Sequence, residues 1–212
     1  ALKIDESVTP KRTGMDPVEW QAYAAAYAVL RKIDTTVAQG ERAQFPRDFD
    51  GLKKLSTPAR RQMATADLEA DVRVAVTSVF PNGTGAGEGP HCLIGNADIL
   101  KKLMATTAGT RGTSGWRHDC RSRQVVYHYM GLPYYRTDFP TAAGKSNVFA
   151  ANLGPTGLNL GYAYGGAESF GLVVDRLPFI EATASASYLV HGAFALLLWE
   201  PEAMFEIFDV AV

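Results

Sequence analysis

The stretch QVVYHYMGLPYYRTDFP, residues 124–140, stands between two halves of the chain that differ in character. Apolar, aromatic and β-branched residues on both sides of Gly131-Leu132-Pro133 follow the two-residue period of strands. We therefore expect a strand over residues 125–130, a corner at Gly131-Leu132-Pro133 and a second strand over residues 134–137. Both faces of the first strand are apolar, so it should lie inside a sheet.

Upstream of this stretch the pattern favours helices. Asp16 and Pro17 provide an N-cap followed by proline at the first helical position, Glu19 completes the start signal, and Gly40 ends the segment. We expect a helix over this range, with one apolar stripe that is buried in the core. The stripe consists of Trp20, Tyr23, Tyr27, Leu30 and Ile33.

A longer helix is expected over residues 57–80. Thr57-Pro58 repeats the start signal, and Pro81-Asn82-Gly83 interrupts the apolar pattern at the other end. The apolar face of this helix would be formed by Ala64, Leu68, Val72, Ala75, Val76 and Val79. The shorter elements expected around it are a loop held to the core by Phe45, Phe49 and Leu52, a strand over residues 91–94, and a helix capped by Asn96.

Downstream of residue 140 the pattern favours strands separated by glycine-rich turns. The expected strands cover residues 148–153, 158–164, 170–175 and 182–199, followed by a turn and tail over 201–207. Residues 182–199 contain no Asp, Glu, Lys or Arg, but their strongly apolar part is too short to span a membrane, so we interpret them as buried strand. Helices first and strands afterwards indicate an α+β fold.

Length and composition are those of a soluble globular protein. The 212 residues suffice for one domain or two small subdomains, with 47% hydrophobic and 20% charged residues. The 21 basic and 22 acidic residues nearly cancel, so the net charge of -1 gives no overall nucleic-acid footprint. Two cysteines are too few for a disulfide scaffold, which favours a reducing compartment. The first residues lack the apolar segment of a signal peptide, and the absence of an initial Met suggests processing or trimming.

The motifs typical of metal-binding, phosphate-binding and dinucleotide-binding sites are incomplete in this sequence. His91-Cys92 and His118-x-Cys120 could supply zinc ligands, but adjacent residues of a strand point to opposite faces. Residues 143–146 resemble the end of a phosphate loop, yet Phe139 occupies the position of its first glycine. Gly85-x-Gly87 similarly lacks the third glycine of a dinucleotide fingerprint. We therefore expect no catalytic, cofactor-binding or metal-binding residues.

The basic residues are concentrated in one place. Arg111, Arg117, Arg121 and Arg123 fall within thirteen positions. A run of this kind is most often a solvated loop with ion pairs. The alternative is a surface that meets phosphate groups or the carboxylates of a partner, because arginine binds both well.

Several segments, taken in order, resemble a known family. They are GERAQFPRDFDGLKKL (40–55), HCLIGNADILKKL (91–103), QVVYHYMGLPYYRTDFP (124–140), NVFAANLGPTGLNLGYAYGG (147–166), SFGLVVDRLP (169–178) and WEPEAMFEI (199–207). This order is similar to that of the major capsid proteins of tailed bacteriophages, whose fold is also used by encapsulin shells. The resemblance covers the chain from about Asp16 onward.

The resemblance implies a peripheral domain (P-domain) with a long spine helix and an axial domain (A-domain) with a mixed sheet. The expected division is an arm over 1–15, a P-domain over 16–80 with the spine at 57–80, an A-domain over 81–178, and a C-terminal strand and tail over 179–212 that return to the P-domain. The family usually has a longer arm and an extended hairpin, the E-loop, before the spine. Its crosslinking residues cannot be transferred to this sequence.

The resemblance also implies a structural function without enzymatic activity or cofactors. Family members self-assemble into pentamers and hexamers of an icosahedral shell around double-stranded DNA, with scaffolding, portal and sometimes decoration proteins as partners, and without a membrane. The expected location is the virion capsid, after assembly in the host cytoplasm. Two alternatives remain open: an encapsulin-like shell or other phage structural protein, and a small-substrate hydrolase that uses His118, Asp119 or His128.

Overall fold

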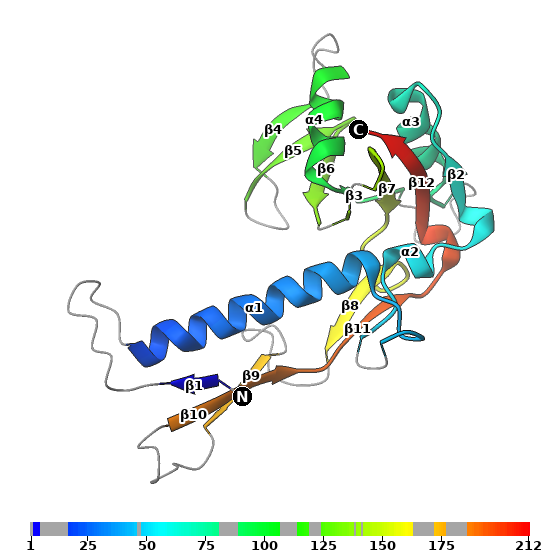
Figure 1. Cartoon of the computed structure of the whole chain (residues 1–212). Coiled ribbons are helices and arrows are strands. Elements are labelled where there is room, and N and C mark those ends of the chain that lie inside the picture. Colours follow the sequence, from blue (N-terminus) through cyan, green and yellow to red (C-terminus); the bar gives the residue numbers. More distant parts are fainter. Residues whose placement is uncertain are drawn as a thin grey trace. The chain divides into compact units, whose positions relative to one another are not determined.

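The computed structural model describes residues 2–4, 17–45, 48–80, 89–106, 114–118, 124–137, 139–140, 142–162, 172–176 and 186–212. The chain forms two compact units. The first unit comprises Ala1–Asp34 and Gly161–Ala195, and the second comprises Thr35–Leu160 and Leu196–Val212. Figure 1 shows the elements of both, coloured along the sequence. No helix among the described residues is long and apolar enough to cross a membrane.

The second unit is built on a seven-stranded mixed sheet with the strand order β2-β12-β7-β3-β6-β5-β4 (Figure 1). The pairs β12–β2 and β3–β6 are parallel, and the other pairs are antiparallel. The expected α+β class with a mixed sheet is therefore confirmed. In sheet order, the strands are Arg61–Met63, Met204–Ala211, Lys145–Ala151, Cys92–Gly95, Leu132–Arg136, Val125–Tyr129 and Gly115–His118.

Strand β7 shows why this sheet is stable, because it is buried on both faces. Val148 and Ala150 point into one hydrophobic cluster, whereas Phe149 and Ala151 point into another. Helices α3 (Leu68–Ser78) and α4 (Ala97–Thr106) contact each other and β7, and they cover the first of these faces. The alternation of a strand thus places its residues in two cores at once.

The opposite face of the sheet carries the second cluster. Leu52 of α2 (Leu52–Leu55) and Ala38 near the end of α1 (Pro17–Gln39) are fully buried there. Phe139 stacks on Phe149 with ring centres 5.1 Å apart. Of the three anchors expected in the loop before α2, Leu52 is buried and Phe49 packs against this cluster, but Phe45 is exposed.

The first unit contains a three-stranded antiparallel sheet with the order β1-β10-β9. Its strands are Leu2–Ile4, Ala186–Gly192 and Leu172–Arg176. The expected arm therefore contains a short strand. Two further strands, β8 (Leu158–Tyr162) and β11 (Phe194–Leu198), pair with each other, so the single strand expected over residues 182–199 is in fact two.

The expected long helix over residues 57–80 is wrong in its first half. Pro58–Arg60 form a 3-10 turn, Arg61–Met63 form β2, and α3 begins only at Leu68. Asp67 caps α3, because its side chain accepts a hydrogen bond from the backbone N–H of Ala70 at 3.1 Å. Parallel pairing of β2 with β12 is a long-range interaction, and it outweighs the local helical pattern.

The turn between β5 and β6 lies one residue earlier than expected. Tyr129 pairs with Leu132, so Met130 and Gly131 form a two-residue hairpin turn. Their φ angles are 52° and 82°, the positive values that such a turn requires at both positions. Leu132 and Pro133 belong to β6, and β5 lies between β4 and β6, inside the sheet as expected.

The last strand, β12, pairs with strands from two of the expected domain segments, and the expected domain division stays a prediction. β12 pairs on one side with β2, which lies in the segment expected as P-domain, and on the other side with β7, which lies in the segment expected as A-domain. One sheet therefore contains parts of both segments. The division into residues 16–80, 81–178 and 179–212 does not coincide with the two compact units.

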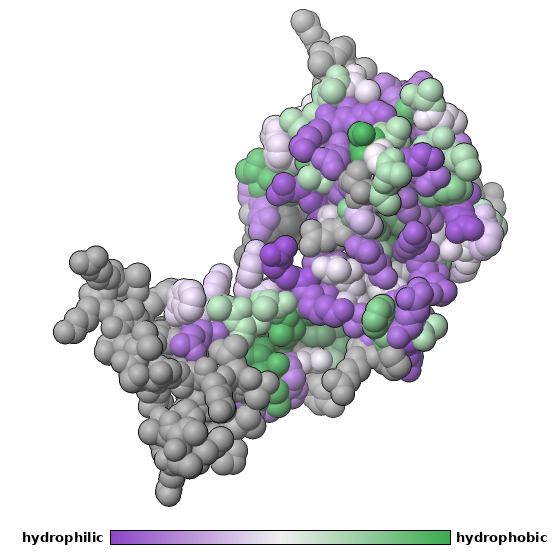
Figure 2. Space-filling view, viewed as in Figure 1, coloured by the Kyte–Doolittle hydropathy of each residue, from purple (hydrophilic) through white to green (hydrophobic). Residues whose placement is uncertain are grey.

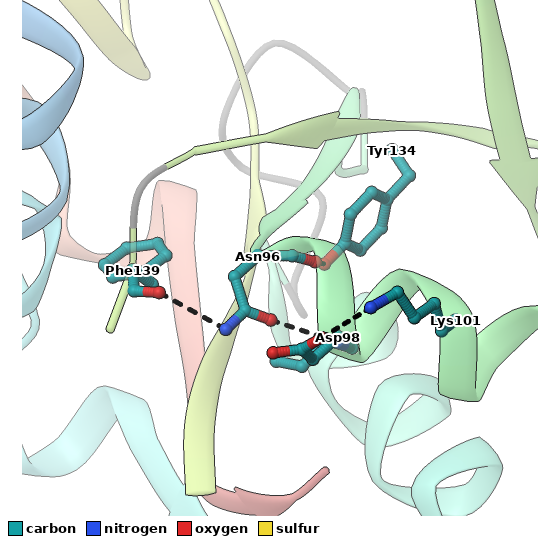
Figure 3. A network of polar contacts seen from close by, with 6 residues as sticks. Asn96, Asp98, Lys101, Tyr134 and Phe139 are labelled. Carbon is teal, nitrogen blue, oxygen red and sulfur yellow. Dashed lines mark hydrogen bonds and ion pairs between the residues drawn. The ribbon is translucent and has the colours of Figure 1, made fainter. Parts of the chain in front are cut away.

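Asn96 fixes the start of α4, as Figure 3 shows. Its side-chain oxygen accepts a hydrogen bond from the backbone N–H of Ile99 at 3.0 Å, which is the expected N-cap. Its side-chain nitrogen donates to the carbonyl of Phe139 at 3.2 Å. Asp98 and Lys101 form an exposed ion pair in the first turn, at 2.9 Å (Figure 3). The cap thus also ties α4 to the chain that follows β6.

Candidate functional site

The four arginines singled out in the sequence are not brought together by the described part of the structure. Arg117 lies on β4 with its side chain exposed. Arg111, Arg121 and Arg123 lie outside the described residues. Their proposed role toward a neighbouring subunit or DNA therefore stays a prediction.

Strand β4, which carries Arg117, is the edge strand of the seven-stranded sheet as described. Trp116 is 58% exposed and meets Tyr127 edge-on, with ring centres 5.7 Å apart. An edge strand presents unpaired backbone groups to which another chain can add. This edge, with its exposed aromatic and basic side chains, is one candidate contact surface.

A second surface lies on α1, where the sequence interpretation was wrong. Trp20, Tyr23 and Tyr27 were expected in the core, but they are 60%, 71% and 58% exposed. The partly buried side of the helix instead carries Ala25, Ala26, Val29 and Ile33. Figure 2 shows pale and green residues along the middle of α1, whereas purple, hydrophilic residues predominate over the second unit. We call the exposed stripe Trp20, Tyr23, Tyr27 and Leu30 the aromatic face.

One sequence signal could have identified this face. Residues 20–30 contain no charged side chain, and both sides of the helix are apolar. A helix that is apolar all round is usually covered on all sides. The periodic stripe alone cannot distinguish a core face from a contact face, because both exclude water in the finished structure.

The histidines considered for catalysis do not share a site. His118 pairs directly with Val125, so their side chains lie on the same face of the sheet. His128 is three positions after Val125 and therefore projects from the opposite face. His118 is exposed, whereas His128 is buried. Asp119 lies outside the described residues.

The zinc candidates are likewise separated by their surroundings. Leu153 donates its backbone N–H to His91 Nδ1 at 3.1 Å. Cys92 is fully buried in the second cluster, and Cys120 lies outside the described residues. Within the described ranges, no group of three or more His, Cys, Asp or Glu side chains could hold a metal ion.

The second unit also contains a cavity of about 410 Å³ that the sequence did not reveal. It lies where the end of α1, α2, β2, residues 139–140 and 142, the start of β7 and β12 meet. The charged residues that line it are Glu41, Lys53, Lys54, Arg61, Lys145 and Asp209. We call it the basic cavity. Its residues come from five distant segments, which is why no local sequence pattern indicates it.

Glu206 does not line this cavity itself, but it contacts two lining residues, Asn147 and Arg61, and it is only 1% exposed. Asn147 Nδ2 donates a hydrogen bond to its Oε1 at 2.7 Å, while its Oε2 has no hydrogen-bond partner. Burial raises the pKa of the Glu206 carboxyl, and Ser56, Arg61, Lys53 and Asn147 oppose this shift. Arg61 is its direct cross-strand partner in the β2–β12 pair.

No protein-family model and no curated protein matches the chain, but solved structures do. The encapsulin of the holo-SrpI complex from Synechococcus elongatus PCC 7942 superposes with a TM-score of 0.73 at 16% identity, over 95% of this chain and 69% of that chain. The capsid of an empty GTA particle gives a TM-score of 0.63 at 15% identity, over 95% of this chain and 69% of that chain. The chain has the capsid fold. The putative capsid protein of a prophage from E. coli CFT073 gives a TM-score of 0.54 at 10% identity, over 99% of this chain and 75% of that chain.

The capsid fold confirms the resemblance inferred from the order of sequence segments. At 10% to 16% identity, the likeness concerns the path of the backbone and not individual side chains. The aromatic face of α1 and the β4 edge are two surfaces of the described residues that carry exposed aromatic side chains.

Proposed function

We propose that this chain is a structural capsid protein that self-assembles into the pentamers and hexamers of an icosahedral shell enclosing double-stranded DNA. The observation that carries the proposal is the capsid fold over 95% of the chain in two independent superpositions. Under this proposal the protein acts through contacts between copies and not through catalysis. Its location would be the virion capsid after assembly in the host cytoplasm, with scaffolding, portal and decoration proteins as further partners.

The aromatic face of α1 supports self-assembly. Trp and Tyr are the residues that contribute most to binding energy at protein interfaces, and an exposed apolar stripe is costly in a protein that stays monomeric. Trp20, Tyr23 and Tyr27 lie at helical spacings of three and four, so one partner could cover all of them. We propose that this face is buried against a second copy in the shell.

The parts of the family pattern can be assigned anew within this proposal. The seven-stranded mixed sheet would be the A-domain sheet, and α1, with 23 residues, would be the spine helix in place of residues 57–80. Arg111, Arg117, Arg121 and Arg123 would face a neighbouring subunit or the packaged DNA.

Negative-stain electron microscopy and analytical ultracentrifugation of the purified protein test the proposal. We expect closed shells, alone or with the scaffolding protein encoded beside it. A protein that stays monomeric at all concentrations, with its own scaffold present, would contradict the proposal.

A triple variant tests the role of α1. Replacing Trp20, Tyr23 and Tyr27 by Ser should abolish shells and leave a folded monomer, as judged by circular dichroism and thermal unfolding. Val74→Ser, at an exposed apolar position of α3, is the matched control and should still assemble. If the triple variant forms shells in normal yield, α1 is not part of the interface between copies.

An encapsulin-like shell is the second candidate, favoured by the TM-score of 0.73 to the Synechococcus encapsulin. The contents of purified particles distinguish the two. Double-stranded DNA resistant to nuclease inside the shell supports the phage capsid, whereas a co-purifying cargo enzyme supports the encapsulin. Neighbouring genes for a portal and terminase, or for a cargo enzyme, provide the same distinction.

A further inference from the structure

The basic cavity has more positive than negative charge on its walls. Lys54 is paired with Glu41 at 3.1 Å, and Lys145 with Asp209 at 3.3 Å. These two ion pairs use both of the carboxylates that line the cavity. Lys53 and Arg61 are the remaining cations, so the described lining carries two positive charges that its own acidic side chains do not balance.

Arg61 is held in place at this cavity. Its guanidinium lies over the ring of Phe208, 5.6 Å from the ring centre, and β2 fixes its backbone beside β12. A cation–π contact occupies no hydrogen-bond acceptor, so the guanidinium can still donate its N–H groups to an anion. No ion pair within 4.0 Å joins Arg61 or Lys53 to a carboxylate of the described residues.

The carboxyl of Glu206 does not satisfy these two cations. Glu206 interacts electrostatically with both Arg61 and Lys53, which shows that the two cations converge on one region. Its Oε1 is already bonded to Asn147, and no hydrogen bond joins its Oε2 to either cation. Burial raises the pKa of the Glu206 carboxyl and favours its neutral form, so this carboxyl is a weak counter-ion for Lys53 and Arg61.

We propose that the basic cavity binds a phosphate dianion, either free phosphate or a phosphate monoester, through Arg61 and Lys53. A phosphate group carries between one and two negative charges at neutral pH and so matches the two unbalanced cations, whereas one carboxylate balances only one of them. Arginine presents a planar pair of donors to phosphate oxygens, and lysine adds a mobile point charge. The volume of about 410 Å³ is within the usual range for small-ligand sites and exceeds the need of free phosphate.

Isothermal titration calorimetry of the full chain at low ionic strength tests this site, with inorganic phosphate, glycerol phosphate and acetate as probes. We expect phosphate and glycerol phosphate to bind with one site per chain, and acetate to bind more weakly by at least about tenfold. Lys53→Gln and Arg61→Gln should each weaken phosphate binding by about tenfold or more, because each removes one of the two unbalanced cations.

Two controls separate this site from general charge effects and from unfolding. Lys101→Gln removes an exposed cation of α4 that does not line the basic cavity, and it should leave phosphate binding unchanged. Lys53 is an exposed side chain, so Lys53→Gln tests the site even if Arg61→Gln fails to fold.

Three results would overturn the proposal. One is the absence of phosphate binding to the folded wild-type chain. Another is a loss of phosphate affinity in Lys101→Gln that equals the loss in Lys53→Gln and Arg61→Gln. The third is binding of a short DNA duplex that depends on Lys53 and Arg61 while inorganic phosphate does not bind, because the surface would then read a nucleic-acid backbone and not a phosphate dianion.

Discussion

The hydroxyl of Tyr134 donates a hydrogen bond to the backbone carbonyl of Asn96 at 2.8 Å (Figure 3). This carbonyl also accepts the N–H of Leu100 at 3.3 Å, so it belongs to the first turn of α4. Tyr134 lies on β6, which is parallel to β3, the strand that leads into Asn96. One phenol therefore fixes the point at which the chain leaves the sheet and enters the helix.

Tyr134→Phe should lower the free energy of unfolding by about 1 kcal/mol, the usual net value of one buried hydrogen bond. The ring keeps its packing, so the effect comes from the hydroxyl alone. Chemical denaturation measures it, and Tyr162→Phe, at an exposed tyrosine of β8, should be neutral. Equal losses in both variants would mean that the Tyr134 hydroxyl has no special role.

Gly95→Ala should lower the free energy of unfolding by roughly 1–3 kcal/mol, because a methyl group at this position would clash with the Tyr134 hydroxyl. Gly89→Ala is the control, since a methyl group there meets nothing within 4 Å. The penalty of Gly95→Ala should shrink when Tyr134 is already Phe, because the clashing oxygen is gone. A penalty of the same size in both backgrounds would place the strain elsewhere.

Glu206→Gln should change how stability depends on pH. The raised pKa of Glu206 means that the folded protein holds a proton at pH values where the unfolded chain has lost it. Folding then binds protons, so the wild type loses stability as pH rises above the ordinary value of 4.5. Each unit of pKa shift corresponds to about 1.4 kcal/mol. Urea denaturation between acidic and neutral pH should show that the free energy of unfolding of the variant rises relative to that of the wild type as the pH rises. A difference between the two proteins that does not change with pH would contradict this expectation.

Arg121→Glu combined with Arg123→Glu should impair shell assembly or DNA packaging while the subunit still folds. The reversed charges would repel phosphates or carboxylates that arginines attract. Particle yield and nuclease-protected DNA measure the effect, and Lys101→Glu on α4 is the control for charge alone. An unfolded double variant would instead give these arginines a structural role.

Sequence patterns predicted the elements whose stability is mainly local. Asn96 and Pro17 carry start signals that work within one turn of helix, and α4 and α1 form where expected. The alternation around Tyr127 and Tyr129 predicted β5, and the order of segments predicted the fold. The helix starts and the strand alternation depend on neighbours in the sequence, which the sequence displays directly, whereas the fold was inferred from the resemblance to a family.

The incorrect or missing predictions concern interactions between distant segments. Residues 61–63 have a helical pattern, yet they pair with β12 near the other end of the chain. Tyr23 belongs to a regular apolar stripe that is exposed. The basic cavity joins Lys53 to Asp209 across most of the sequence. No local pattern records such pairings, because they depend on which segments meet in the folded state.

The place of β12 in the sheet also bears on how the protein is made. β12 lies between β2 and β7, although it is synthesised after both. Before residues 204–211 are synthesised, β2 has no described strand partner and β7 lacks its neighbour on one side, so the seven-stranded sheet cannot form. A subunit interrupted before β12 would expose two open strand edges. The seven-stranded sheet therefore forms only in chains that contain β12.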